Sequence, residues 1–176
     1  MSSHFSGRTV VDLNVTCAMG DKLAPTTRHA YTHEGRVVYE WDQTLDECNF
    51  YVRTPPGVKA KSLDVEMTST SVKFGIKGNP PYLHHELTEA VKAADSFWTL
   101  EDGELHIQMT KLHKGRPWVS LFKGHGMLDP AAEEAEKARL MKERFAEEHP
   151  GFDFSGAEFN GAAPDPSKFM GGIGHN

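Results

Sequence analysis

Short stretches in which apolar and polar residues alternate recur between residues 39 and 122, and turn residues separate them. Such alternation is typical of β-strands with one buried face, because successive side chains of a strand point to opposite sides of the sheet. Several short strands at close spacing are typical of an all-β sandwich or barrel. The pattern predicts an antiparallel β-sandwich of about seven strands over residues 39–124.

The positions of individual strands follow from the alternating residues. Cys48, Phe50 and Val52 alternate up to Pro55-Pro56, where two successive residues lack the backbone N–H that a strand ladder needs. Further strands are predicted at residues 63–67, 72–76, 82–87, 98–100, 105–109 and 118–122. The Asp102-Gly103 pair predicts a tight hairpin between two of them, since both residues tolerate a positive φ.

After Gly126 the pattern changes to the spacing of a helix. Asp129 and Pro130 are typical of an N-cap and first helical position, and they predict a C-terminal α-helix over residues 129–149. Its apolar residues fall three or four positions apart: Ala131, Ala135, Ala138, Met141 and Phe145. Its i,i+4 charge pairs are expected on the solvent side, at a few tenths of a kcal/mol each: Glu133 with Lys137, Arg139 with Glu143, and Arg144 with Glu148.

The two ends of the chain lack a sustained period. Residues 1–38 predict a largely irregular arm with at most one strand, near residues 11–15. Residues 150–176 form a tail rich in Gly and Pro, and we expect disorder after Pro164. The tail also carries Phe152, Phe154 and Phe159, so its first part is expected to dock, either within the chain or on a partner.

Charge and cysteine content restrict the class of protein. The net charge is −6 and the sequence pI about 5.9, and no stripe of Lys and Arg is present to follow a phosphate backbone, so nucleic acid is not expected as a partner. Only Cys17 and Cys48 occur, which fits a reducing compartment. The N-terminus lacks an apolar run long enough for a signal peptide or membrane span, so a cytoplasmic protein is expected.

No catalytic or metal-binding pattern is found in the sequence. Ser120 lacks the glycine-flanked elbow of a nucleophile, and Cys48 is at an inward strand position where a thiol is inert. His84 and His85 point to opposite sides of a strand, and the i,i+4 spacing of His29 and His33 brings them together only on a helix. His106 is expected to be a solvated strand residue. We therefore expect no cofactor, no metal and no enzymatic activity.

Several motifs resemble one family. Trp41, Gln43 and Thr44 precede the strand at Cys48 and the Pro55-Pro56-Gly57 turn, and they are followed by WTLED from residue 98, Thr110-Lys111, and Trp118 with Ser120-Leu121. Together with the string KERFAEEHPGFDFSGAEF over residues 142–159, they resemble the NudC family of CS-domain proteins. The resemblance covers about residues 39–160. It departs from the family at His85, where a glycine is usual and would permit a backbone shape that histidine resists.

The resemblance implies a sandwich shared with the p23 co-chaperone and the small heat-shock proteins of the Hsp20 type. It also implies a co-chaperone that assists Hsp90 and holds client proteins, including β-propeller clients of the dynein pathway. The implied partner-binding residues are Lys111 and Trp118 in the sandwich, and Arg144, Phe145, Phe152 and Phe154 beyond it. An alternative is a structural adaptor of a motor or cytoskeletal complex without generic chaperone activity, for which a homodimer through the helix is one form.

Overall fold

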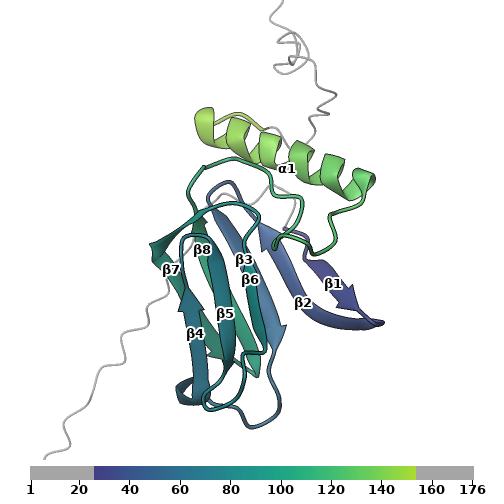
Figure 1. Cartoon of the computed structure of the whole chain (residues 1–176). Helices are drawn as coiled ribbons and strands as arrows, with labels where there is room; N and C mark the ends of the chain where they lie inside the picture. Colours follow the sequence, from purple (N-terminus) through teal and green to yellow (C-terminus); the bar gives the residue numbers. More distant parts are fainter. Residues whose placement is uncertain (1–25, 154–176) are drawn as a thin grey trace, which may run out of the picture.

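Two antiparallel sheets and one helix make up the computed structural model, which describes residues 26–153 (Figure 1). The strands are β1 (His29–His33), β2 (Arg36–Gln43), β3 (Glu47–Arg53), β4 (Leu63–Met67), β5 (Ser71–Ile76), β6 (Leu83–Glu86), β7 (Val91–Glu101) and β8 (Glu104–Lys111). A 3-10 turn, Ala60–Ser62, precedes β4, and the helix α1 spans Pro130–Glu148. One sheet has the order β1-β2-β3-β8-β7 and the other β4-β5-β6.

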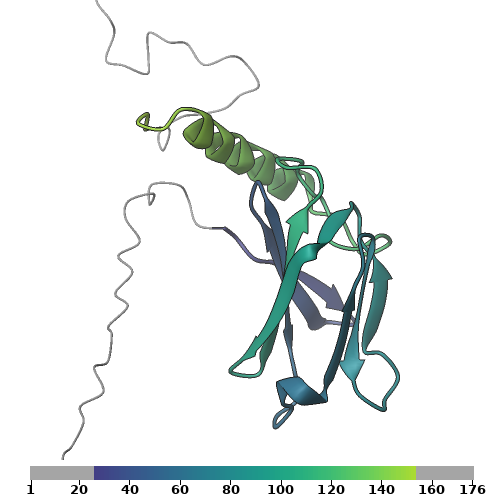
Figure 2. The same cartoon turned by 90° about the vertical axis from the view of Figure 1, so that its left-hand side faces the viewer.

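The two sheets face each other, and α1 lies across one end of them (Figure 2). A mostly β structure with two antiparallel sheets and a C-terminal helix confirms the predicted fold class. The part of the chain that the structure describes has eight strands, where the sequence predicted about seven.

Two strands at the beginning of the domain, β1 and β2, are additional to the predicted ones, and the strand predicted at residues 118–122 is absent. β1 and the first residues of β2 fall within residues 1–38, where the sequence predicted a largely irregular arm, and the turn between them has positive φ at Glu34 (50°) and Gly35 (76°). β1 gives a weak hydrophobic signal, because most of its residues are exposed and Tyr31 is the one hydrophobic residue of this strand that packs against the core. The sandwich therefore begins at His29. The strand predicted near residues 11–15 lies outside the described residues.

The strand predicted at residues 118–122 is wrong. Trp118, Leu121 and Phe122 are all buried, so this segment does not alternate, and it forms a single isolated bridge from Phe122 to Leu87. Its backbone still pairs locally, with Thr88 N donating to the Leu121 carbonyl at 3.0 Å. The segment thus seals the edge of the three-stranded sheet without extending it.

The hairpin predicted at Asp102-Gly103 is confirmed. Both residues have positive φ, 48° and 76°, and Glu101 pairs with Glu104 across the turn. These are the backbone angles of the two-residue turn whose twist matches that of antiparallel strands. The turn therefore sets the register of β7 and β8, which lie at the free edge and next to it in the five-stranded sheet.

Aromatic side chains fill the space between the sheets. The Phe50 ring lies 5.5 Å from that of Phe122 and 5.9 Å from that of Phe74, in edge-to-face arrangements. Cys48 is fully buried beside them, and burial raises the pKa of its thiol to about 12. A thiol in this state behaves as a small apolar side chain, as the sequence predicted.

The predicted bounds of α1 and its cap are also confirmed. Asp129 Oδ1 accepts hydrogen bonds from the amides of Ala131 and Ala132, both at 3.0 Å. These amides belong to the first turn, where the helix has no internal partners for them.

Replacing Asp129 with alanine is expected to lower the free energy of unfolding by about 1 kcal/mol, because two amides of the first turn lose their acceptor. Urea denaturation followed by circular dichroism measures this change. An Asp129→Asn variant should retain most of the stability, since asparagine is also a good N-cap. Equal stability of the alanine variant and the wild type would contradict the capping role.

The orientation of α1 is opposite to the predicted one. Ala131, Ala135 and Met141 are exposed, whereas Glu136 and Leu140 are buried against the sandwich. The predicted i,i+4 pairs all exist. Glu133–Lys137 and Arg144–Glu148 lie on the solvent side as predicted. Arg139 and Glu143 instead lie on the buried side. The reason lies in the surface that α1 covers, which consists of strand ends and loops with backbone groups that need hydrogen-bond partners.

Candidate partner-binding surface

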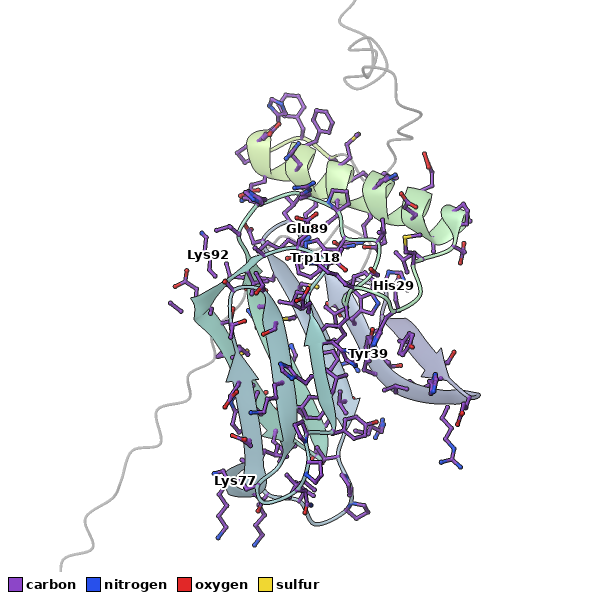
Figure 3. The ribbon with its side chains drawn as sticks, viewed as in Figure 1. His29, Tyr39, Lys77, Glu89, Lys92 and Trp118 are labelled. Atoms are coloured by element: carbon purple, nitrogen blue, oxygen red, sulfur yellow. The ribbon has the colours of Figure 1, made fainter. Side chains whose placement is uncertain are left out.

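A buried polar cluster lies at the end of the sandwich beneath α1, where Figure 3 shows Trp118. The Lys111 ammonium donates to Gln43 Oε1 at 2.9 Å, to the Thr44 carbonyl at 2.8 Å and to the Arg116 carbonyl at 3.0 Å. The Gln43 amide in turn holds the backbone of Trp118, donating to its carbonyl and accepting from its N–H, both at 2.9 Å. All three donors of the lysine are used, so the cluster fixes the loop after β8.

Lys111 and Trp118, two of the predicted partner-binding residues, are therefore interior residues in this structure. Each is only 2% exposed, and both belong to the buried cluster. Burial lowers the pKa of Lys111 to about 8 despite nearby acidic groups. Both residues hold the loop over residues 112–118 in place, and their part in binding a partner stays a prediction.

A second set of contacts attaches α1 to the sandwich. The Arg139 guanidinium donates to the backbone carbonyl of Gln43 and to both oxygens of Glu136, at 2.9 and 3.1 Å. Glu143 accepts from the amide of Leu45 at 3.2 Å. His29 Nε2, which is buried, lies 3.5 Å from Glu136 Oε1, too far for a well-formed hydrogen bond. Charged groups therefore hold the helix.

The free energy of unfolding is expected to fall at acidic pH, because the Glu136 carboxylate that helps to attach α1 becomes protonated. Burial opposes the charge of Glu136, but the nearby His29 and the hydrogen bonds and charge of Arg139 outweigh it and lower the pKa of Glu136 to about 2, from 4.5. A carboxyl with a lowered folded-state pKa contributes stability that is complete above pH 4.5 and is lost as the pH falls toward 2. We expect a loss on the order of 1–3 kcal/mol across this window, measured by urea denaturation at a series of pH values.

Two variants separate this effect from general acid denaturation. Glu136→Gln should be less stable at neutral pH and should show a smaller decline between pH 5 and 2, because the group that titrates is gone. Glu133→Gln removes a carboxylate of the same helix that is paired with Lys137 near the surface, and it should leave the profile nearly unchanged. Equal slopes for wild type and Glu136→Gln would contradict the assignment.

The candidate residues at the end of α1 lie together. The Arg144 side chain is 53% exposed and lies beside Gly115 and 4.0 Å from Glu148. Phe145 is half-buried and stacks with His149, with 6.3 Å between ring centroids, and His149 meets the edge of Phe152 at 6.2 Å. Phe152 is 48% exposed. Phe154 lies outside the described residues.

A more extensive surface, missed by the sequence analysis, is the outer side of the five-stranded sheet. Cross-strand pairing aligns its side chains in rows, such as Thr99, His106 and Tyr51 across three neighbouring strands. The outward sheet face is defined by Glu40, Asp42, Glu47, Asn49, Tyr51, Phe97, Thr99, Glu104, His106 and Gln108. The signal for it in the sequence was the polar half of the strand alternation, of which only His106 was considered, as a solvated residue.

Side chains of this face are held by one another. The Tyr51 hydroxyl donates to Asp42 Oδ2 at 3.2 Å, and Asn49 Nδ2 donates to Asp42 Oδ1 at 2.9 Å. His106 Nε2 is 3.0 Å from Asn49 Oδ1, and its ring stacks on that of Tyr51 at 4.6 Å. Burial and Asp42 raise the pKa of Tyr51 to about 12, and burial lowers that of His106. Tyr51 stays protonated and His106 neutral near pH 7, so His106 is not simply solvated.

Arg28, just before β1, adds a positive charge to the face, where it contacts residues of β2, β3 and β8. Its guanidinium pairs with Glu104 at 3.1 Å and Glu40 at 3.3 Å, and its central carbon lies 3.5 Å from the centre of the Tyr51 ring. The outward sheet face therefore presents ordered aromatic, cationic and anionic groups in one layer. On its edge strand β7, Phe97 is 50% exposed.

Histidines also meet on the other side of the β1–β2 hairpin. The His125 ring stacks on Tyr31 at 4.4 Å and lies 4.3 Å from that of His85, and its Nδ1 is 2.9 Å from the Tyr39 hydroxyl. Burial, with His85 and His33 nearby, lowers the pKa of His125. His85 pairs with Val72 in a regular ladder, so it needs no glycine-like backbone. Within residues 26–153, no group of three or more His, Cys, Asp or Glu is arranged to hold a metal ion.

Among the described residues, α1 is too polar to cross a membrane, and no other helix there is long enough to do so.

Comparison with known proteins finds a domain model and relatives that all carry a CS or NudC name. The CS domain model matches residues 37–111. NudC domain-containing protein 2 of Homo sapiens is 35% identical over 125 residues, which cover 69% of this chain and 79% of that protein. Nuclear movement protein nudc of Schizosaccharomyces pombe is 35% identical over 107 residues, covering 58% of this chain and 63% of that one.

Among solved structures, the crystal structure of NudC domain-containing protein 2 from Mus musculus aligns at 27% identity with a TM-score of 0.38. The alignment covers 73% of this chain and 96% of that one.

Proposed function

Because the chain belongs to the NudC family of CS-domain proteins, we propose that it is a cytoplasmic, non-enzymatic co-chaperone that assists Hsp90 and stabilises client proteins. The family resemblance, rather than a bound partner, supports this proposal. Relatives named for nuclear movement or nuclear migration support clients in a motor pathway, and β-propeller proteins of the dynein pathway are the clients we propose.

The structural observation that supports the proposal, in addition to the family, is the outward sheet face. Protein interfaces are enriched in Tyr, Phe and Arg and need groups that lose little freedom on binding. Tyr51 and Arg28 meet this need, because each is already held by neighbouring side chains. Phe97 adds an exposed apolar side chain on the same side of the sheet. The face thus offers a partner a rigid layer with both charge and aromatic area.

Two assays test the proposal on the purified full chain. The chain should suppress light scattering by a heat-unfolded test protein, and it should co-purify with Hsp90 in at least one nucleotide state. Failure in both assays would overturn the co-chaperone proposal.

The second candidate function is a structural adaptor of a motor or cytoskeletal complex. The exposed side of α1, with Met141 42% exposed, is the observation that favours it, since such a side could join two copies of the chain. Light scattering at several protein concentrations separates the two candidates. A dimer without activity in either assay supports the adaptor, and an active monomer supports the co-chaperone.

A further inference from the structure

The Arg28 side chain lies in a small site on the outward sheet face. Two of its guanidinium nitrogens contact the Glu104 carboxylate, at 3.1 and 3.3 Å, and one of them also contacts Glu40 at 3.3 Å. The central carbon of the guanidinium lies 3.5 Å from the centre of the Tyr51 ring. We call Tyr51, Glu40 and Glu104 the guanidinium site. They come from the neighbouring strands β3, β2 and β8, so the order of the sheet brings them together.

The geometry of the site favours a guanidinium over an ammonium group. A guanidinium is planar, so it can lie on an aromatic ring and also present a fork of two N–H donors to one carboxylate. Arg28 makes both kinds of contact, with Tyr51 and with Glu104. A lysine ammonium is a compact point charge without such a fork. The site therefore has the chemistry to distinguish arginine from lysine.

The aromatic wall of the site is held by residues other than Arg28. The Tyr51 hydroxyl donates to Asp42 Oδ2 at 3.2 Å, and Asn49 Nδ2 donates to the other oxygen of Asp42 at 2.9 Å. The His106 ring also stacks on that of Tyr51, with 4.6 Å between their centroids. A site that is ordered in advance loses little freedom when a ligand binds. The Tyr51 ring is therefore ready to receive a cation from outside the chain.

Arg28 can be displaced from the site at little cost. It precedes β1, whose ladder with β2 begins at the pair His29 and Trp41, so removing its side chain breaks no strand pair. The Arg28 side chain is 40% exposed, and those of Glu40 and Glu104 are 41% and 25% exposed. Ion pairs with such exposure contribute little to stability, because water and salt screen them. An arginine of another protein can therefore take the same position.

The charge around the site also favours a cationic occupant. Glu40, Asp42 and Glu104 bring three carboxylates to this part of the outward sheet face. Arg53, opposite Glu104 in the ladder of β3 and β8, adds one positive charge. Without Arg28, carboxylates outnumber basic side chains among these residues. The site would then attract a positively charged group.

We propose that the guanidinium site binds an arginine side chain of a partner protein, and that Arg28 competes with this arginine from within the chain. The inference rests on the proposed function in placing a partner on the outward sheet face, and it adds the chemistry by which the site recognises that partner. Because Arg28 is tethered beside the site, its high local concentration weakens binding of the partner's arginine.

Peptide titration of the full chain tests the proposal, followed by the backbone NMR signals of Tyr51 and Glu104. The probes are acetyl-Gly-Arg-Gly-amide and acetyl-Gly-Lys-Gly-amide at constant ionic strength. In Arg28→Ser, both signals should shift saturably, with a Kd for the arginine peptide at least about threefold below that for the lysine peptide, as expected from stacking on an exposed ring. The wild type should bind the arginine peptide at least about threefold more weakly than Arg28→Ser does.

Two further variants separate the site from the overall charge of the chain. In the Arg28→Ser background, Glu104→Gln should remove the preference for the arginine peptide, because the carboxylate that accepts the fork is gone. Glu86→Gln makes the same change of charge on the three-stranded sheet, where Glu86 pairs with Lys123, and it should keep the preference. All these variants should melt near the wild-type temperature, since the replaced side chains are at least partly exposed.

Three results would overturn the proposal: equal affinity of Arg28→Ser for the two peptides, equal affinity of Arg28→Ser and the wild type for the arginine peptide, or a preference that survives Glu104→Gln. The titration contains no Hsp90. Its failure would therefore leave the co-chaperone proposal to its own two assays, and failure in those assays would leave the peptide result standing.

Discussion

Replacing Gln43 with leucine is expected to lower the free energy of unfolding by about 3–5 kcal/mol, the largest loss among the substitutions considered. Gln43 is fully buried, and its amide holds the N–H and carbonyl of Trp118 and one donor of Lys111. Leucine fills the space but pairs with none of these groups, so a buried lysine charge loses a partner and two backbone groups are orphaned.

Urea denaturation measures the loss, and a second glutamine provides the control. Gln108 lies on the outward sheet face, where it donates to Glu47 and is only partly buried. Gln108→Leu should change stability by less than about 1 kcal/mol. A Gln43→Leu protein as stable as Gln108→Leu would show that the buried cluster does not hold the loop after β8.

Replacing Arg139 with methionine is expected to cost about 3 kcal/mol and to release α1 from the sandwich. Methionine keeps the length of the side chain but leaves Glu136, which is 5% exposed, with His29 as its remaining partner. It also removes the donor to the Gln43 carbonyl. Removing one partner of a buried ion pair costs about 3–5 kcal/mol, because the other charge remains in a medium of low polarity.

Hydrogen exchange localises this effect. The amides of residues 134–148 should exchange much faster in Arg139→Met, while those of β3 and β8 change little. Arg144→Met is the matched control in the same helix, since the Arg144 side chain is 53% exposed and its ion pair with Glu148 is long. Its exchange should match that of the wild type. Unchanged helix exchange in Arg139→Met would show that apolar contacts, such as those of Leu140, suffice to hold α1.

The features that were predicted correctly from the sequence are those set by residues close together along the chain. The Asp102-Gly103 turn and the Asp129 cap depend on a few neighbouring residues, and both are confirmed. The orientation of α1 was predicted wrongly for a physical reason. Periodicity identifies which helix residues share a side, but the choice of the buried side depended on backbone groups at the ends of distant strands, such as the Gln43 carbonyl.

The candidate site was also predicted incompletely, because its surface depends on contacts between residues that are distant along the chain. Lys111 follows Leu105, Ile107 and Met109 at every second position, so the alternation itself places it on the inner side of the sheet. The family resemblance pointed to Lys111 as a contact residue, and the structure shows a buried one. The outward sheet face could not be assembled from the sequence, because its rows depend on the order β2-β3-β8-β7, in which strands distant along the chain become neighbours.

The central proposal is that the chain assists Hsp90, and the outward sheet face is the surface we propose for this contact. Two exposed aromatic residues make a matched pair for testing it: Phe97, 50% exposed on this face, and Tyr82, 61% exposed beside the three-stranded sheet. Serine at either site should leave the melting temperature nearly unchanged, because exposed positions contribute little to stability.

Calorimetric titration of Hsp90 with the full chain and with both variants is the most direct measurement. We predict saturable binding by the wild type, a Kd at least tenfold higher for Phe97→Ser, as expected for an interface anchor, and an unchanged Kd for Tyr82→Ser. Binding by Phe97→Ser at the wild-type Kd, or no saturable binding by the wild type, would contradict this proposal.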